Sequence, residues 1–218
     1  AISFDNLDFS LGLDVNSFKI QNTGLTINLA NLSYVYKLQF DNDLFFLPAV
    51  SLGLGSSAVN PGNLIFEDQL NTATGFISTE SIDPLAPLIS SVNYFDLGAS
   101  FIIHNEFYMV GLSLKHLNKP NVSYNKEVPY AKPISVGIQA GYEFNINPFE
   151  RSILPRFSYL YTFLNLNKYG DSTYIGLAEE FQFGEFSFGF TQQAASVNSF
   201  ALNNIGLTMG LALENFDF

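Results

Sequence analysis

The chain has 218 residues, of which 47% are hydrophobic and only 13% are charged. Soluble globular proteins carry about twice that share of charge. Acidic residues outnumber basic ones by 20 to 9, which excludes the basic surface that a nucleic-acid-binding protein needs. The absence of cysteine excludes disulfides and thiolate metal sites. No apolar run reaches the roughly 18 residues of a spanning helix, so the apolar residues must belong to another kind of element.

Hydrophobic residues alternate with polar or small ones along most of the chain, which is the period of a β-strand with one apolar face. Aromatic residues make up 16% of the chain, all of them Phe or Tyr, and both favour strands. In chain order, the alternation predicts ten strands: Leu7–Val15, Leu25–Phe40, Leu44–Leu54, Phe95–Ile103, Tyr108–Leu114, Ile134–Ile146, Phe157–Phe163, Ile175–Phe183, Phe186–Phe190 and Ile205–Leu213.

Three local features interrupt this pattern, and the faces of one further strand are assigned from it. The apolar phase switches within 25–40, which predicts a β-bulge near Ala30–Asn31. Pro48 favours an edge strand or a bulge. The residues Phe157, Tyr159, Tyr161 and Phe163 are taken as the apolar face of their strand. Glu179 interrupts another apolar face, and we expect it near a rim or at a contact with a partner.

The predicted connections alternate between short and long. Short links are expected at 41–43, 104–106, 147–150 and 184–185, and longer ones at 16–23, 57–92, 118–131, 165–171 and 192–204. Outer-membrane barrels have short periplasmic turns on one rim and long extracellular loops on the other. With the short turns periplasmic, both termini are expected to be periplasmic.

Strand length and alternation together predict an all-β fold, a transmembrane antiparallel up-and-down outer-membrane β-barrel formed by a single domain over 1–218. At least ten strands are visible. The first residues, Ala1–Asp5, lack the basic and apolar regions of a signal peptide, and we expect any export signal to have been removed. A soluble β-sandwich is the alternative, but its second face would carry many charges.

Catalytic chemistry has little support in the sequence. The two histidines, His104 and His116, are predicted on opposite rims, so neither a shared metal site nor a Ser/His/Asp triad is expected. Glu179 and Glu180 are adjacent in a strand and point to opposite faces, so they do not form an acid/base pair. No cofactor and no enzymatic activity are expected.

The hairpin from Tyr94 to Ser100 and from Glu106 to Leu114, followed by His116-Leu117-Asn118-Lys119-Pro120, resembles the PorP/SprF family. Weaker similarity extends to Asn22–Leu25 and to the strands after Ala131. The resemblance implies an outer-membrane barrel of the type IX secretion system of Gram-negative bacteria, with a role in protein secretion or gliding motility. Members of this family begin with a further segment that contains an Asn-Pro-Ala motif, which is absent here. The resemblance therefore implies either a larger barrel of about twelve to fourteen strands with an N-terminal segment missing, or a shortened relative with about ten.

The resemblance further implies that the barrel binds a secreted cell-surface protein, such as an adhesin, through the C-terminal domain of that protein. Other expected partners are outer-membrane lipid and further components of the secretion system, including periplasmic ones. The loops 57–92 and 118–131 are the candidate contact surface, because long outer loops can reach such a partner. The candidate contact residues are His116, Asn118, Pro120, Leu64, Ile65 and Phe66. Loop geometry is the alternative explanation for the first three. The apolar stretches Leu64–Phe66 and Leu85–Ile89 could instead plug the lumen or cap the barrel.

Two other functions stay open at this point. A passive porin or small-solute transporter would use the polar face of the strands, although wide channels need about sixteen strands. An outer-membrane hydrolase or acyltransferase would need a catalytic Ser or Asp beside a histidine at the outer rim, and only His116 is placed for that role.

Overall fold

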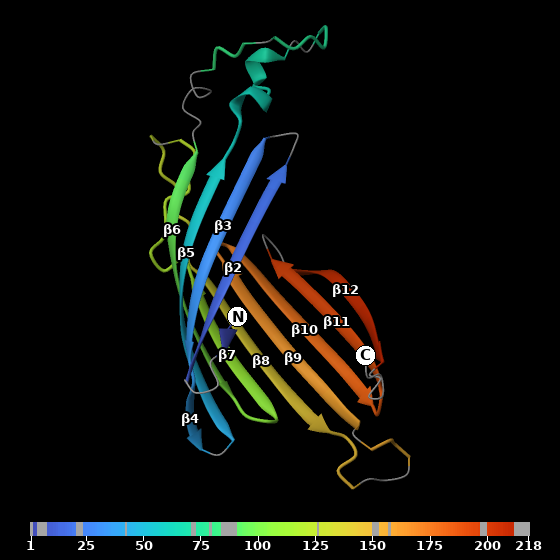
Figure 1. The fold of residues 1–218 in the computed structure, drawn as a ribbon. Helices are drawn as coiled ribbons and strands as arrows, with labels where there is room; N and C mark the ends of the chain where they lie inside the picture. Colours follow the sequence, from blue (N-terminus) through green and yellow to red (C-terminus); the bar gives the residue numbers. More distant parts are fainter. Residues whose placement is uncertain are drawn as a thin grey trace, which may run out of the picture. The chain divides into compact units, whose positions relative to one another are not determined.

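The structure is a computed structural model, and it describes residues 2–3, 8–20, 24–41, 43–70, 73–78, 80–83, 91–125, 127–149, 153–156, 158–196 and 200–211. Strands make up most of the chain (Figure 1). They are β1 (Ile2–Ser3), β2 (Phe9–Ile20), β3 (Leu25–Tyr36), β4 (Leu38–Asp41), β5 (Leu44–Ala58), β6 (Val92–His104), β7 (Tyr108–Lys115), β8 (Ser135–Asn145), β9 (Ser158–Tyr169), β10 (Ser172–Phe183), β11 (Phe186–Ser196) and β12 (Phe200–Leu211). Two short 3-10 helices, η1 (Pro61–Asn63) and η2 (Glu67–Gln69), lie between β5 and β6.

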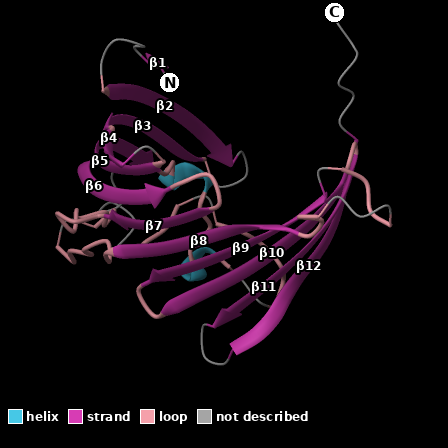
Figure 2. Cartoon of the chain, turned by 90° about the horizontal axis from the view of Figure 1, so that it is seen from below, coloured by secondary structure: helices cyan, strands magenta, loops and turns pink. Residues whose placement is uncertain are grey.

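The predicted strands are confirmed: each of the ten corresponds to a long strand of the structure. Within the described ranges no helix is long and apolar enough to cross a membrane. The hydrogen-bonded order is β1-β2-β3-β5-β6-β7-β8-β9-β10-β11-β12, with β4 paired to β5 beside that path. Apart from this short strand, each strand pairs with its neighbours along the chain, which is the up-and-down arrangement predicted above. Figure 2 shows β8 to β12 side by side in this order.

The chain divides into two compact units. Unit 1 comprises Ala1–Val35, Val50–Gly98 and His116–Pro133, and unit 2 comprises Tyr36–Ala49, Ala99–Lys115 and Ile134–Phe218. Unit 1 contains the two longest connections, and unit 2 contains the regular ladder of strands β7 to β12.

The register of unit 2 separates an apolar face from a polar face, because directly opposed residues of antiparallel strands lie on the same face. One row across the ladder is entirely apolar and consists of Leu112, Ile138, Leu166, Ile175, Ala194 and Leu202. The next row, on the opposite face, consists of Gly111, Gln139, Asn165, Gly176, Gln193 and Asn204. Among the described residues no Val, Ile, Leu, Met, Phe or Tyr side chain is buried. In the described residues, therefore, no hydrophobic core covers the apolar face of unit 2.

The apolar face of β9 differs from the prediction. Tyr161 pairs with Glu143 and Glu180, so it lies on the polar face together with Tyr159 and Phe163. The apolar face of β9 is instead formed by Leu160, Leu164 and Leu166. Both faces of this strand contain large hydrophobic residues, and a tyrosine suits a polar face because its hydroxyl needs a polar partner.

Glu179 lies on the apolar face, as predicted, but well inside the strand. It pairs with Thr162 on one side and Phe190 on the other. Two further apolar-face residues, Phe181 and Phe183, separate it from the turn at 184–185. Thr162 gives this carboxylate one polar neighbour in an otherwise apolar region.

The predicted bulge near Ala30–Asn31 is wrong. Two side-chain hydrogen bonds join β2 to β3, Ser17 with Asn28 and Asp14 with Asn31, and a Cβ added to Gly12 would lie next to the Cβ of Ser33. From one contact to the next, the number of residues passed along β2 equals the number passed along β3. The strand β3 therefore has no extra residue at 30–31. The change of apolar phase is therefore a change of which face is apolar within one continuous strand.

The interruption lies farther along, at Lys37, which separates β3 from β4. Leu38 pairs with Phe46, which places Tyr36 opposite Pro48. Proline has no backbone N–H to donate to the ladder, and this explains the break. The prediction of an edge strand is wrong, because β5 lies between β3 and β6.

Several connections differ in length from the prediction. The links at 21–24, 170–171 and 197–199 are short, because β2, β9, β11 and β12 extend beyond the apolar alternation. Asn165 and Lys168 still pair with β8 and β10, so backbone pairing continues where the apolar face ends. The link 146–157 is longer than the predicted short turn. Leu7, the apolar stretch 85–89, Phe157 and the C-terminal residues 212–218 lie outside the described residues.

Candidate partner-binding rim

The two long connections of unit 1 both adjoin strands β5 and β6. One links β5 to β6 and covers 59–91, and the other, 116–134, links β7 to β8. The Ser57 hydroxyl, at the end of β5, forms a hydrogen bond of 2.6 Å with the Tyr124 hydroxyl of the second connection. This contact joins two segments that are 67 residues apart in the sequence.

Asn118 attaches the second connection to β6. Its amide nitrogen donates a hydrogen bond of 2.7 Å to the carbonyl of Phe95, and its amide oxygen accepts one of 3.0 Å from the N–H of Leu97. The N–H of Leu117 donates to the carbonyl of Leu97 at 3.0 Å. The amide nitrogen and the amide oxygen of Asn118 therefore each bond to a backbone group of β6. In a regular sheet, the neighbouring strand would bond to those groups.

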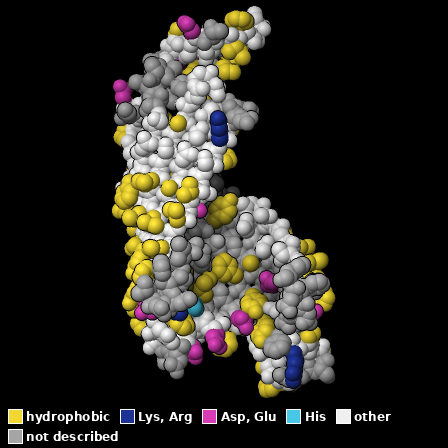
Figure 3. Space-filling view, in the orientation of Figure 1, with side chains coloured by type: hydrophobic (Ala, Val, Ile, Leu, Met, Phe, Trp, Pro, Cys, Tyr) yellow, Lys and Arg dark blue, Asp and Glu magenta, His cyan; other side chains and the backbone are white. Residues whose placement is uncertain are grey.

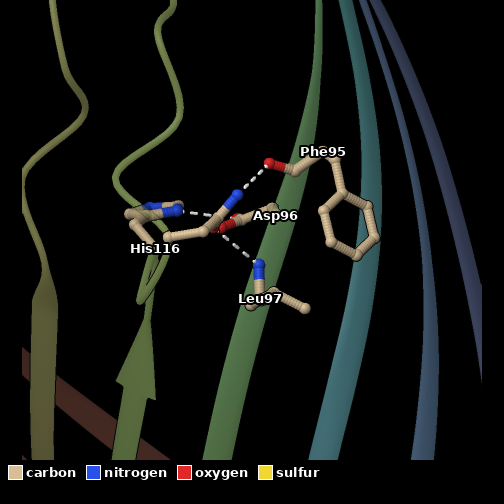
Figure 4. A network of polar contacts seen from close by, with 5 residues as sticks. Phe95, Asp96, Leu97 and His116 are labelled. Atoms are coloured by element: carbon tan, nitrogen blue, oxygen red, sulfur yellow. Dashed lines mark hydrogen bonds and ion pairs between the residues drawn. The ribbon is translucent and has the colours of Figure 1, made fainter.

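His116 lies beside the same strand, as Figure 4 shows. Its Nδ1 is 2.7 Å from Oδ2 of Asp96, and the residue is 9% exposed. The backbone of His116 has a φ of 61°, and that of Lys119 has a φ of 46°. Non-glycine residues adopt such left-handed conformations only where the surroundings hold them. The Asp96 contact and the Asn118 hydrogen bonds hold this turn.

Tyr94 fills the space between β5 and the second connection. A Cβ on Gly55 would lie inside the Tyr94 ring, so only glycine allows this close approach. On its other side, the ammonium of Lys132 lies 5.2 Å from the centre of the ring, which is the geometry of a cation–π contact. These contacts fill the space where the second connection meets β5 and β6.

The first connection is ordered by two polar side chains. Gln69 is 9% exposed; its side chain accepts a hydrogen bond from the N–H of Phe66 at 2.8 Å and donates one to the carbonyl of Ser78 at 3.0 Å. Asp68 accepts from the hydroxyl of Ser81 and, at 2.6 Å, from the N–H of Ile82. An isolated bridge pairs Leu70 with Ile77, next to the hydrogen bond between Gln69 and Ser78.

The environment of Asp68 lowers the pKa of its carboxyl group. Desolvation acts to raise this pKa, but the hydrogen bonds from Ile82 and Ser81 favour the charged form and determine the net direction. The carboxylate that holds Ser81 and Ile82 is therefore ionised over the neutral pH range.

The structure separates the six predicted contact residues into two groups. His116 and Pro120 are buried, and Asn118 uses its amide on the backbone of β6. Ile65 is exposed, while Leu64 and Phe66 beside it are half-buried. Whether any of them contacts a partner stays a prediction. The contributions of Ser57, Asp68, Gln69 and Tyr124 were not foreseen, because hydrogen bonds made by loop residues leave no periodic signal in a sequence.

The arrangement has no sign of a metal centre in the described part of the chain, where no three His, Asp or Glu side chains cluster as ligands do. Long antiparallel strands with one exposed apolar face, one polar face and long loops beyond their ends define an outer-membrane β-barrel protein.

A sequence model of the family described as "Type IX secretion system membrane protein PorP/SprF" matches residues 3–217. The chain therefore belongs to the PorP/SprF family, and it is a membrane protein of the type IX secretion system. The resemblance seen in the hairpin from Tyr94 to Leu114 is thereby confirmed over nearly the whole chain. No curated protein matches it.

Proposed function

We propose that this barrel binds a secreted cell-surface protein through the C-terminal domain of that protein, and so helps to secrete or anchor it. The contact surface is the rim built from the connections 59–91 and 116–134, which faces the cell exterior, with both termini in the periplasm. Support comes chiefly from one observation: the second connection is tied to β5 and β6, and the described part of the first connection is held by hydrogen bonds of its own. A preorganised loop surface loses less conformational entropy on binding than a flexible one.

The first test is affinity purification of the tagged barrel from outer membranes in mild detergent, followed by mass spectrometry. We expect a large surface protein that remains bound through its C-terminal domain. Deletion of 59–91 should abolish its recovery while leaving the barrel in the membrane. A barrel that is purified alone, or a deletion that changes nothing, would contradict the proposal.

Passive passage of small solutes is the second candidate function. It is favoured by the polar rows of unit 2 and by a hollow of about 500 Å³ whose lining includes His104, Glu143 and Tyr161. Single-channel recordings in planar bilayers test it. Steady conductance that Glu143→Gln alters would support a transport role, whereas a silent barrel that retains its protein partner would favour binding.

A further inference from the structure

The described part of the first connection, residues 62–70, 73–78 and 80–83, has a surface of unusual composition, and we call it the acidic platform. Its acidic residues are Glu67, Asp68, Glu80 and Asp83, and neither lysine nor arginine occurs anywhere between 57 and 92. Five large hydrophobic side chains in it are exposed, namely Ile65, Leu70, Phe76, Ile77 and Ile82. Figure 3 shows hydrophobic and acidic side chains on this segment, at the top of the view.

Exposure of these hydrophobic residues is a consequence of how the platform is ordered. The Gln69 side chain occupies the interior position of the turn and bonds to backbone on both sides, so the hydrophobic side chains are directed outward. Ile82 is 89% exposed and Phe76 is 68% exposed. Asp68 holds Ile82 in place through its backbone N–H. An ordered segment that keeps apolar side chains in water marks an interaction site.

We propose that the acidic platform is a preformed docking surface for a protein whose own contact surface is an apolar patch bordered by Lys and Arg. The charge of the platform selects this occupant. A second copy of the chain would bring two all-acidic segments together, and anionic lipid headgroups would be repelled in the same way. The inference rests on the proposed function and deepens it, because it states the surface chemistry that the secreted partner must have.

The chain contains no cysteine, so a single cysteine provides a unique attachment point. We would attach a photo-reactive maleimide to Phe76→Cys in the full-length barrel in cells, irradiate, and map the cross-linked peptides. The expected product is an intermolecular cross-link to an apolar segment flanked by Lys or Arg. The control is Asp171→Cys, at an exposed position in the turn between β9 and β10, outside both long connections.

Four results would overturn the inference: a cross-link to lipid, to a second copy, to the barrel itself, or to no molecule from Phe76→Cys. These results remain distinguishable from failure of the proposed function. If affinity purification recovers a surface protein while Phe76→Cys cross-links elsewhere, only the acidic platform is rejected. If no surface protein is recovered at all, the proposed function fails as well.

A quantitative comparison uses matched variants of the same barrel. Phe76→Ser with Ile82→Ser, and separately Glu67→Lys with Glu80→Lys, should each lower the amount of this partner recovered by affinity purification by about tenfold or more. The matched controls are Ile153→Ser, at an isoleucine that is 87% exposed in unit 2, and Glu185→Lys, at an exposed turn. Equal recovery from platform and control variants would also overturn the inference.

Discussion

Asn118 shows how one side chain can replace a stretch of strand pairing. Its amide satisfies the carbonyl of Phe95 and the N–H of Leu97, so loss of the amide leaves two backbone groups to water. We expect Asn118→Ala to lower the free energy of unfolding by about 1 to 3 kcal/mol. Urea unfolding of the purified barrel measures this change.

Asn118→Asp tests the two hydrogen bonds of the Asn118 amide separately. An aspartate keeps the acceptor for Leu97 but loses the donor to Phe95, and it brings a negative charge near that carbonyl. It should therefore also destabilise the turn, and limited proteolysis should cut 119–131 faster in both variants. Wild-type stability in Asn118→Ala would mean that water replaces the amide at no cost.

Gly55 is a second position where a single atom decides the packing, because an added Cβ would overlap the Tyr94 ring. Gly55→Ala is expected to cost about 1 to 3 kcal/mol of stability through overpacking. The double variant with Tyr94→Ala removes the overlap and should recover part of that loss. A double variant with the summed loss of both single changes would show that the two residues act independently.

Among the elements, the acidic platform depends on the ionised carboxylate of Asp68. Because its folded pKa lies below the ordinary value of 3.8, the stabilisation is present above that value and is lost as the pH falls through the folded pKa. Protease cleavage of the platform should therefore accelerate only below about pH 4. Asp68→Asn should show fast cleavage at neutral pH, and a profile identical to that of wild type would refute this account.

Strand β10 presents adjacent glutamates to opposite faces. Glu179 lies in the apolar row of Tyr142 and Phe190, and Glu180 lies in the polar row of Glu143 and Tyr161. Removing a charge from a lipid-facing position should stabilise the barrel, whereas the polar face tolerates charge. We expect Glu179→Gln to raise the free energy of unfolding by about 1 to 2 kcal/mol. Glu180→Gln should change it little, and unfolding in liposomes compares the two variants directly.

At the scale of the whole molecule, the assignment of faces predicts which side meets lipid. Leu164→Lys places a charge on the apolar face and should cost about 2 to 4 kcal/mol. Asn165→Lys, one residue farther along β9, places the same charge on the polar face and should cost much less. Insertion yield and heat resistance on gels measure both variants, and equal effects would contradict the assignment.

The sequence by itself determined the fold class and the positions of the ten long strands. Period-two alternation is set by the geometry of a strand, and the lipid environment requires one continuous apolar face, so each strand shows its pattern independently of its neighbours. The family was equally visible, because the hairpin from Tyr94 to Leu114 is a local stretch of sequence.

Only the tertiary structure decided the faces of β9, the continuity of β3 and the construction of the rim. Leu160 and Tyr161 suit either face by hydrophobicity, and their pairing with β8 and β10 makes the choice. The hydrogen bonds of Asn118 to β6 and of Ser57 to Tyr124 join residues far apart in the chain. Such contacts depend on which strand ends lie next to each other in the folded chain. The spacing of residue types along the sequence does not determine which ends these are.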